Sequence, residues 1–114
     1  MDERRRFERM TQVFPAEVYS RQSGKIVGLV ADVSSGGLLL RTETPQSPGE
    51  DLELTLELPA GKQVTREFEL VARVRWCEPD IAPGTYVLGL AFTGRTAPDG
   101  PVAMDLVRAL KDAS

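Results

Sequence analysis

The 114-residue chain has no histidine and only one cysteine, Cys77. Histidine is the commonest general base and the commonest metal ligand, so its absence argues against Ser-His or Cys-His hydrolases and against a zinc site. A single cysteine cannot form an intrachain disulfide, which is compatible with a reducing compartment. Enzymes that use only carboxylates stay open, but no residue pattern favours one. We therefore expect a protein without catalytic activity, metal or cofactor.

Long apolar runs are also missing. No stretch approaches the roughly 20 apolar residues that span a bilayer, and the charged N-terminus is not followed by the apolar core of a secretory signal. A cytoplasmic protein without membrane insertion is expected. The net charge of −3 lacks the basic excess that is typical of proteins that bind nucleic-acid polymers.

Alternation of apolar and polar residues predicts β-strands. Leucines occupy every second position of 51–58, and the run 64–76 alternates in the same way up to Trp76, which is expected to lie in the core. Shorter apolar runs between segments rich in Gly, Pro and Ser predict four more strands, at residues 13–20, 26–31, 38–42 and 86–92.

The C-terminal residues change to a helical period. An Asp-Gly-Pro sequence at 99–101 suits a helix start, and apolar residues recur on one helical face after it. Six strands at hairpin spacing and one amphipathic helix predict a mainly β fold, a six-stranded antiparallel β-barrel with a C-terminal α-helix covering an opening. The expected organisation is a flexible arginine-rich segment at 1–12, the barrel at 13–94 and the helix at 99–112.

Two groups of residues stand out from the predicted scaffold. The first is an Arg-x-x-x-Arg sequence; the second is an Asp-x-Ser-x-x-Gly sequence at a strand end. The candidate ligand-binding residues are Arg4, Arg5, Arg6, Arg9, Asp32, Ser34, Gly36 and Gly37. An arginine fork matches guanine O6 and N7, or a phosphate, through two hydrogen bonds. Asp32 can accept from guanine N1 and N2 or orient an arginine, Ser34 can donate to a phosphate or to the backbone, and Gly37 permits a close backbone approach or a positive φ at the turn.

In this order and at about this separation, the two motifs resemble the signature motifs of the PilZ family, as does the later pattern of residues 73–76 followed by 89–92. The resemblance covers residues 3–94. It implies a non-enzymatic receptor that binds the bacterial second messenger cyclic di-GMP on the barrel's outer surface, with Arg5 and Arg9 folded over the ligand.

The resemblance also bears on stoichiometry and partners. In that family an arginine before the Arg-x-x-x-Arg motif accompanies a stacked, intercalated ligand pair, so Arg4 favours such a pair, with Arg4 or Arg6 adding contacts. A domain without an attached effector must act on an unidentified effector protein, which would recognise the surface that the ligand changes.

Simpler interpretations stay open beside this one. The arginine-rich N-terminus can be a solvated tail, and Asp32 and Ser34 can merely cap the backbone of their own turn. The alternative function is a ligand-independent PilZ-like adaptor that works by protein contacts in pilus assembly or motility, although the presence of both motifs favours the receptor. An oligonucleotide-binding barrel would need exposed aromatics, and most of the one Trp, two Tyr and four Phe fall at inward positions.

Overall fold

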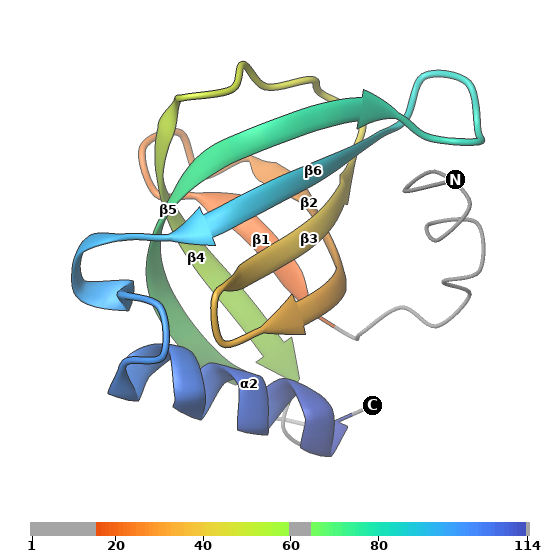
Figure 1. Ribbon diagram of the computed structural model, residues 1–114. Coiled ribbons are helices and arrows are strands. Elements are labelled where there is room, and N and C mark those ends of the chain that lie inside the picture. Colours follow the sequence, from red (N-terminus) through yellow and green to blue (C-terminus); the bar gives the residue numbers. More distant parts are fainter. Residues whose placement is uncertain (1–15, 60–64, 114) are drawn as a thin grey trace.

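The computed structural model of the chain describes residues 16–59 and 65–113, and within them it contains a closed barrel of six antiparallel strands with one α-helix (Figure 1). The predicted six-stranded barrel with a C-terminal helix is thereby confirmed. The strands are β1 (Glu17–Ser20), β2 (Ile26–Ser34), β3 (Gly37–Thr42), β4 (Asp51–Pro59), β5 (Thr65–Pro79) and β6 (Tyr86–Phe92). Their order around the barrel is β1-β2-β3-β6-β5-β4.

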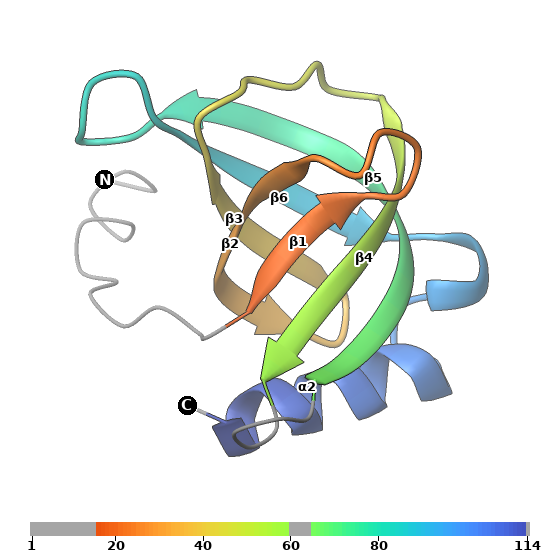
Figure 2. The same ribbon diagram turned by 180° about the vertical axis from the view of Figure 1, so that it is seen from behind.

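The short strand β1 closes the barrel because it pairs with β2 on one side and with β4 on the other (Figure 2). The alternating leucines of β4 explain its place in the wall. Leu54 and Leu56 point inward and lie opposite Leu70 and Phe68 of β5, while the residues between them face outward. Period-two patterning therefore gives each strand one face in the core and one face outside.

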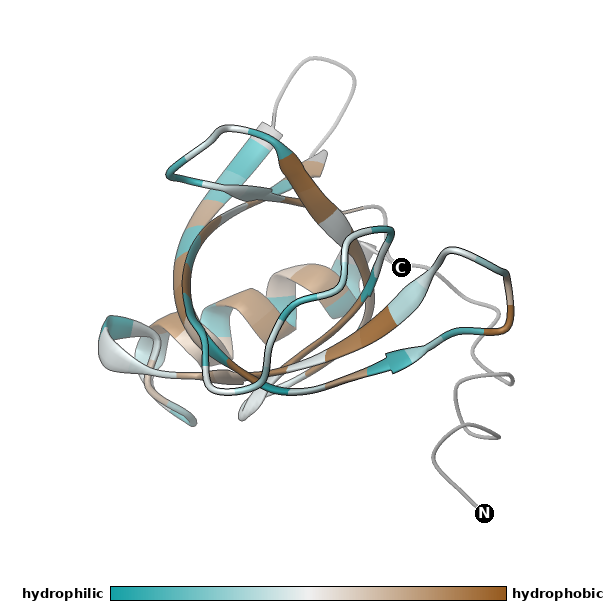
Figure 3. Cartoon of the chain, turned by 90° about the horizontal axis from the view of Figure 1, so that it is seen from above, coloured by the Kyte–Doolittle hydropathy of each residue, from teal (hydrophilic) through white to brown (hydrophobic). Residues whose placement is uncertain are grey.

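The helix α2 (Pro101–Ala113) crosses one end of the ring of strands (Figure 3). Its apolar stripe joins the barrel core, where Leu106 and Leu110 are fully buried. Burial of each leucine stabilises the fold by about 1.5–3 kcal/mol relative to exposure. A short 3-10 helix, η1 (Gly94–Thr96), connects β6 to α2 and was not predicted. Neither helix in the described part of the chain is long and apolar enough to cross a membrane.

The prediction that Trp76 lies in the core is wrong. The pairing of β5 with β6 shifts between Val74 and Trp76, so that Arg75 is an extra residue in the strand, a β-bulge. Val74 is buried before the bulge, and Cys77 packs against the core after it. The inward phase thus changes from even to odd residue numbers, and Trp76 lies half-buried on the outer surface.

Strand β2 extends further than predicted. Residues 32–34 have turn composition, yet Val33 is buried in the core between Asp32 and Ser34, which are both exposed. This alternation continues the strand by three residues beyond its predicted end at residue 31. Two members of the Asp-x-Ser-x-x-Gly motif therefore lie on a strand, where the barrel wall fixes the direction of their side chains.

Candidate functional site

The Asp-x-Ser-x-x-Gly motif forms the tip of the β2–β3 hairpin. Ser34 pairs with Gly37, and Ser35 and Gly36 make the turn between them. The Asp32 Oδ1 accepts from the Val33 N–H at 2.8 Å, and the Ser34 Oγ accepts from the Gly36 N–H at 3.2 Å. Both side chains thus cap local backbone. The second carboxylate oxygen of exposed Asp32 has no hydrogen-bond partner among the described residues.

Gly37 occupies a position where no side chain fits. A Cβ at Gly37 would overlap the carbonyl oxygen of Leu90 on β6 and lie 3.2 Å from the Cα of Ala91. A Cβ at Gly36 would meet only the Ser34 Oγ, at 3.8 Å. The two glycines of the motif therefore have different roles: Gly37 allows β3 to approach β6, whereas Gly36 leaves the tip of the turn uncovered.

Two backbone hydrogen bonds hold the turn against the rest of the barrel. The Phe92 N–H donates to the Gly36 carbonyl at 3.0 Å, and the Asp99 N–H donates to the Ser35 carbonyl at 2.9 Å. The first bond joins the turn to the end of β6, and the second joins it to the segment that leads into α2. Because both carbonyls of the turn are engaged, the motif is fixed at the junction between barrel and helix.

Asp32 begins a row of four outward residues across four strands, which we call the Asp32–Trp76 row. Asp32 lies opposite Leu39, Leu39 opposite Gly89, and Gly89 opposite Trp76. With strands about 4.8 Å apart, the row extends over about 14 Å of barrel surface. Strands β3 and β6, which carry its middle, lie at the front of Figure 1.

The Trp76 side chain lies against Gly89. A Cβ built on Gly89 would come within 2.8 Å of the indole Cζ2, so only glycine lets the ring lie this close to the β6 backbone. The row consequently combines a carboxylate at one end with a half-exposed indole at the other. A tryptophan paired with a glycine on the neighbouring strand can indicate a ring packed against that strand. The sequence alone did not indicate this pair, because the bulge at Arg75 shifts the register between β5 and β6.

The remaining candidates from the sequence, Arg4, Arg5, Arg6 and Arg9, lie outside the described residues. The structure therefore places Asp32, Ser34, Gly36 and Gly37 together at one hairpin and leaves their relation to the arginines a prediction.

The other side of the barrel is acidic. Glu17 of β1 lies opposite Glu57 of β4, which lies opposite Glu67 of β5, so three carboxylates are in register on outward positions. The Tyr19 hydroxyl donates to Glu17 Oε1 at 2.7 Å, and this bond raises the pKa of Tyr19, with the charges of Glu17 and Glu57 adding to the effect. Like charges in register repel one another and would repel an anion. This acidic side of the barrel therefore disfavours an anionic ligand.

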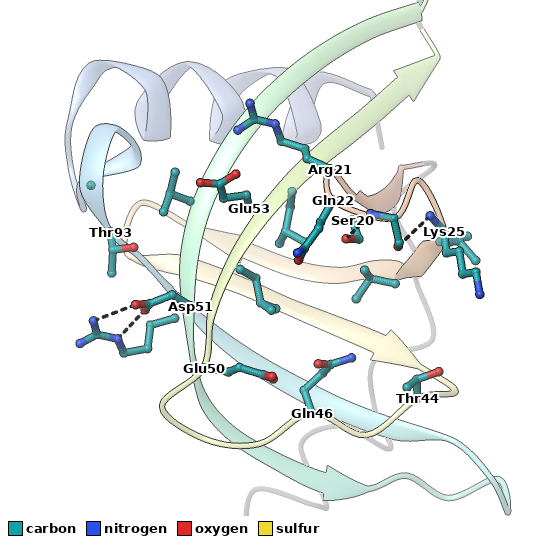
Figure 4. Close-up of a pocket in the computed structure, with 18 residues that line it drawn as sticks. Ser20, Arg21, Gln22, Lys25, Thr44, Gln46, Glu50, Asp51, Glu53 and Thr93 are labelled. Atoms are coloured by element: carbon teal, nitrogen blue, oxygen red, sulfur yellow. Dashed lines mark hydrogen bonds and ion pairs between the residues drawn. The ribbon is translucent and has the colours of Figure 1, made fainter.

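A shallow groove of about 1180 Å³ lies at the barrel rim, between the β1–β2 hairpin and the start of β4 (Figure 4). It includes none of the motif residues. One ion pair lies within it: Arg73 donates to both carboxylate oxygens of Asp51, at 2.8 and 3.4 Å, which lowers the pKa of Asp51. The groove is lined by three basic and three acidic residues, so it has no excess of positive charge to attract an anion.

Metal-ligand side chains do not gather anywhere in residues 16–59 and 65–113. Cys77 is half-buried against the core. Within the same residues every buried side-chain nitrogen and oxygen has a hydrogen-bond partner.

Comparison with known proteins identifies the family and supports the barrel fold. A family model described as the PilZ domain matches residues 3–110. The fold resembles the Bacillus subtilis inhibitor of motility MotI/DgrA, with a TM-score of 0.59 and 21% identity over 90% of this chain, which spans only 46% of that chain. It also resembles the PilZ domain of CeSA from a cellulose-synthesizing bacterium, with a TM-score of 0.51 and 20% identity over 88% of this chain and 94% of that one. No curated protein matches significantly. The family match covers all six strands of the barrel and most of α2, and the chain belongs to the PilZ domain family, a family of cyclic di-GMP receptors.

Proposed function

We propose that the chain is a non-enzymatic receptor that binds cyclic di-GMP at the β2–β3 hairpin and along the Asp32–Trp76 row, and that signals to a protein partner. The observation that supports this most is the position of Asp32. Its carboxylate is exposed on the outer wall, beside a turn fixed by backbone hydrogen bonds and in line with the half-exposed Trp76.

The chemistry of these residues matches the chemistry of the ligand. Cyclic di-GMP has two guanines and two phosphates that carry two negative charges. The exposed Asp32 carboxylate can accept from guanine N1 and N2, and the Ser34 hydroxyl can donate to a phosphate. Gly36 leaves room for the ligand at the turn. The Trp76 ring can stack on a base, as aromatic side chains do in single-strand binding.

The arginine-rich segment supplies the cationic half of the proposed site. Residues 4–9 contain four arginines, whose guanidinium groups can meet a guanine edge or a phosphate bidentately. Arg4 precedes the Arg-x-x-x-Arg sequence and favours an intercalated ligand pair. In this proposal the ligand orders the segment over the barrel, and the newly ordered surface is what an effector protein recognises. The ligand can drive this change only through different affinities for the two states.

The arginine contacts are tested by calorimetry on a variant that carries Arg5→Ala and Arg9→Ala. Truncating each charge-assisted partner should weaken binding by about 2–4 kcal/mol. Arg108→Ala, an exposed position on α2, is the matched control and should bind like the parent. A double variant with parental affinity would refute the role of both arginines.

A ligand-independent adaptor is the second candidate. Two observations favour it: Asp32 and Ser34 already hydrogen-bond to their own backbone, and one structural neighbour is named as an inhibitor of motility. The adaptor would require no ligand, so its partner binding would be the same with and without cyclic di-GMP. The receptor requires that the nucleotide change the affinity for the partner.

Amide hydrogen exchange separates binding from switching. Adding cyclic di-GMP should raise protection at residues 4–9 and 32–37, while β4, which carries no residue of the Asp32–Trp76 row, should change little. Equal protection of residues 4–9 with and without ligand would exclude the switch even if binding is observed.

A further inference from the structure

Arg41 is an arginine of the barrel wall that neither sequence motif contains. Its neighbours Leu40 and Thr42 are both buried inside the barrel, so the Arg41 side chain points outward. It lies opposite exposed Leu29 of β2 and opposite Val87 of β6, which is buried without belonging to the core cluster. The Arg41 side chain is therefore flanked by apolar residues on both neighbouring strands, where water competes less for the hydrogen bonds of its guanidinium.

Asp80 holds this guanidinium in place from the loop between β5 and β6. The Arg41 Nε lies 3.5 Å from Asp80 Oδ2, and the Asp80 side chain is only 8% exposed. The Asp80 Oδ1 accepts from the Ile81 N–H at 2.7 Å, and the Asp80 N–H donates to the Thr85 carbonyl at 2.9 Å. Asp80 is thus fixed by its own loop, and it engages Arg41 at Nε, the nitrogen nearest the side-chain stem.

Arg41 stands beside the Asp32–Trp76 row. Asp32 lies opposite Leu39, and Arg41 is two residues further along the same strand, so Asp32 and Arg41 are diagonal neighbours about 7–8 Å apart. One is an acceptor and the other a donor. Guanine presents N1–H and N2–H donors on one edge and O6 and N7 acceptors on the next, and a bidentate arginine contact to O6 and N7 is the commonest specific contact to guanine.

We propose that Arg41 is a guanine-reading residue of the cyclic di-GMP site, that it donates to O6 and N7 of the base whose other edge meets Asp32, and that Asp80 is its positioning residue. The proposal rests on the function proposed above. It accounts for base selectivity, because adenine carries an amino donor where guanine has O6 and would oppose the arginine donors.

The test is calorimetry with cyclic di-GMP and with its 7-deazaguanine analogue, in which a carbon replaces N7. Arg41→Ala should weaken cyclic di-GMP binding by about 10–100-fold, the scale of a bidentate base contact. The analogue should bind the parent more weakly than cyclic di-GMP does, and this difference should shrink in Arg41→Ala. Arg41→Lys, which keeps the charge without the fork, should not restore affinity.

Asp80→Asn tests the positioning role. The asparagine oxygen can still accept from the Ile81 N–H, so the loop is retained while the ion pair is lost. Binding should weaken by about 2–5-fold, the scale of an ion pair near the surface. The difference in affinity between cyclic di-GMP and its 7-deazaguanine analogue should also be smaller in Asp80→Asn than in the parent, a change that a purely structural role of Asp80 would not produce. Thermal unfolding of each variant checks that the barrel is intact.

Arg66 and Asp105 provide a matched control pair, 3.4 Å apart, that joins β5 to α2 away from the row. Arg66→Ala and Asp105→Asn should bind both ligands as the parent does. If the parent binds but folded Arg41→Ala keeps its affinity and its preference for N7, the inference is wrong and the receptor stands. If the parent does not bind cyclic di-GMP, both are wrong.

Discussion

Replacing Gly37 with alanine should open the barrel at the signature motif. The new methyl group would overlap the Leu90 carbonyl oxygen and lie 3.0 Å from its carbonyl carbon, and both are backbone atoms of the adjacent strand. No side-chain rotation can relieve this contact, so β3 and β6 must separate. Overpacking costs about 1–3 kcal/mol, and each ladder hydrogen bond that is lost adds about 0.5–1.5 kcal/mol. We therefore expect a destabilisation of about 2–4 kcal/mol.

Thermal unfolding followed by circular dichroism measures this change. For a domain of this size, about 4 °C of Tm accompanies each kcal/mol, so Tm should fall by about 8–16 °C. Gly36→Ala is the matched control, because its methyl group would meet only the Ser34 Oγ at 3.8 Å and its φ is not positive. That variant should keep the parental Tm or exceed it slightly. A Gly37→Ala protein as stable as Gly36→Ala would refute the packing argument.

Three further changes test the site and its surroundings. Arg9→Lys should bind cyclic di-GMP about as weakly as Arg9→Ala in calorimetry, since a point charge cannot form a two-pronged contact; parental affinity would make Arg9 a simple counter-charge. Trp76→Ala should weaken cyclic di-GMP binding by about 1–3 kcal/mol, the contribution of one stacked base. Trp76 is the chain's only tryptophan, so tryptophan fluorescence of the parent that does not change on adding ligand would contradict stacking. Arg73→Ala should let the pKa of Asp51 rise toward its ordinary 3.8 in a carboxyl NMR titration. The Asp51–Arg73 pair stabilises the fold at neutral pH, and that stabilisation is lost as the pH falls through the lowered pKa; an Asp51 titration identical in parent and variant would disprove the pairing.

The barrel could be predicted because its strands carry strict alternation. The leucines of β4 and the apolar residues of β5 up to Val74 have one inward and one outward face, and the helix shows an equally regular stripe. The hairpin motif was also identifiable from its spacing. On a regular strand, successive side chains alternate between the two faces of the sheet. The direction of each side chain can therefore be inferred without knowing the partner strand.

The features that were missed depend on pairing between distant strands. The bulge at Arg75 turns Trp76 outward, and one inserted residue leaves no trace in the pattern until the register with β6 is known. Arg41 has no local marker either, because Asp80, which positions it, lies in the β5–β6 loop. A close backbone approach at Gly37 was expected from the sequence, but that β6 supplies the approaching backbone could be known only from the register. The periodicity of the sequence therefore predicts the strands of the barrel. The contacts on its outer surface can be identified only when the pairing register of the strands is known.

The most direct test of the receptor is a calorimetric titration of the purified chain with cyclic di-GMP, beside GTP and cyclic GMP. In the proposed site, Asp32, the arginines and Trp76 would together contact a ligand with two guanines and two phosphates, so cyclic di-GMP should bind saturably while the two mononucleotides bind far more weakly. No binding of cyclic di-GMP, or equal binding of all three nucleotides, would contradict the account.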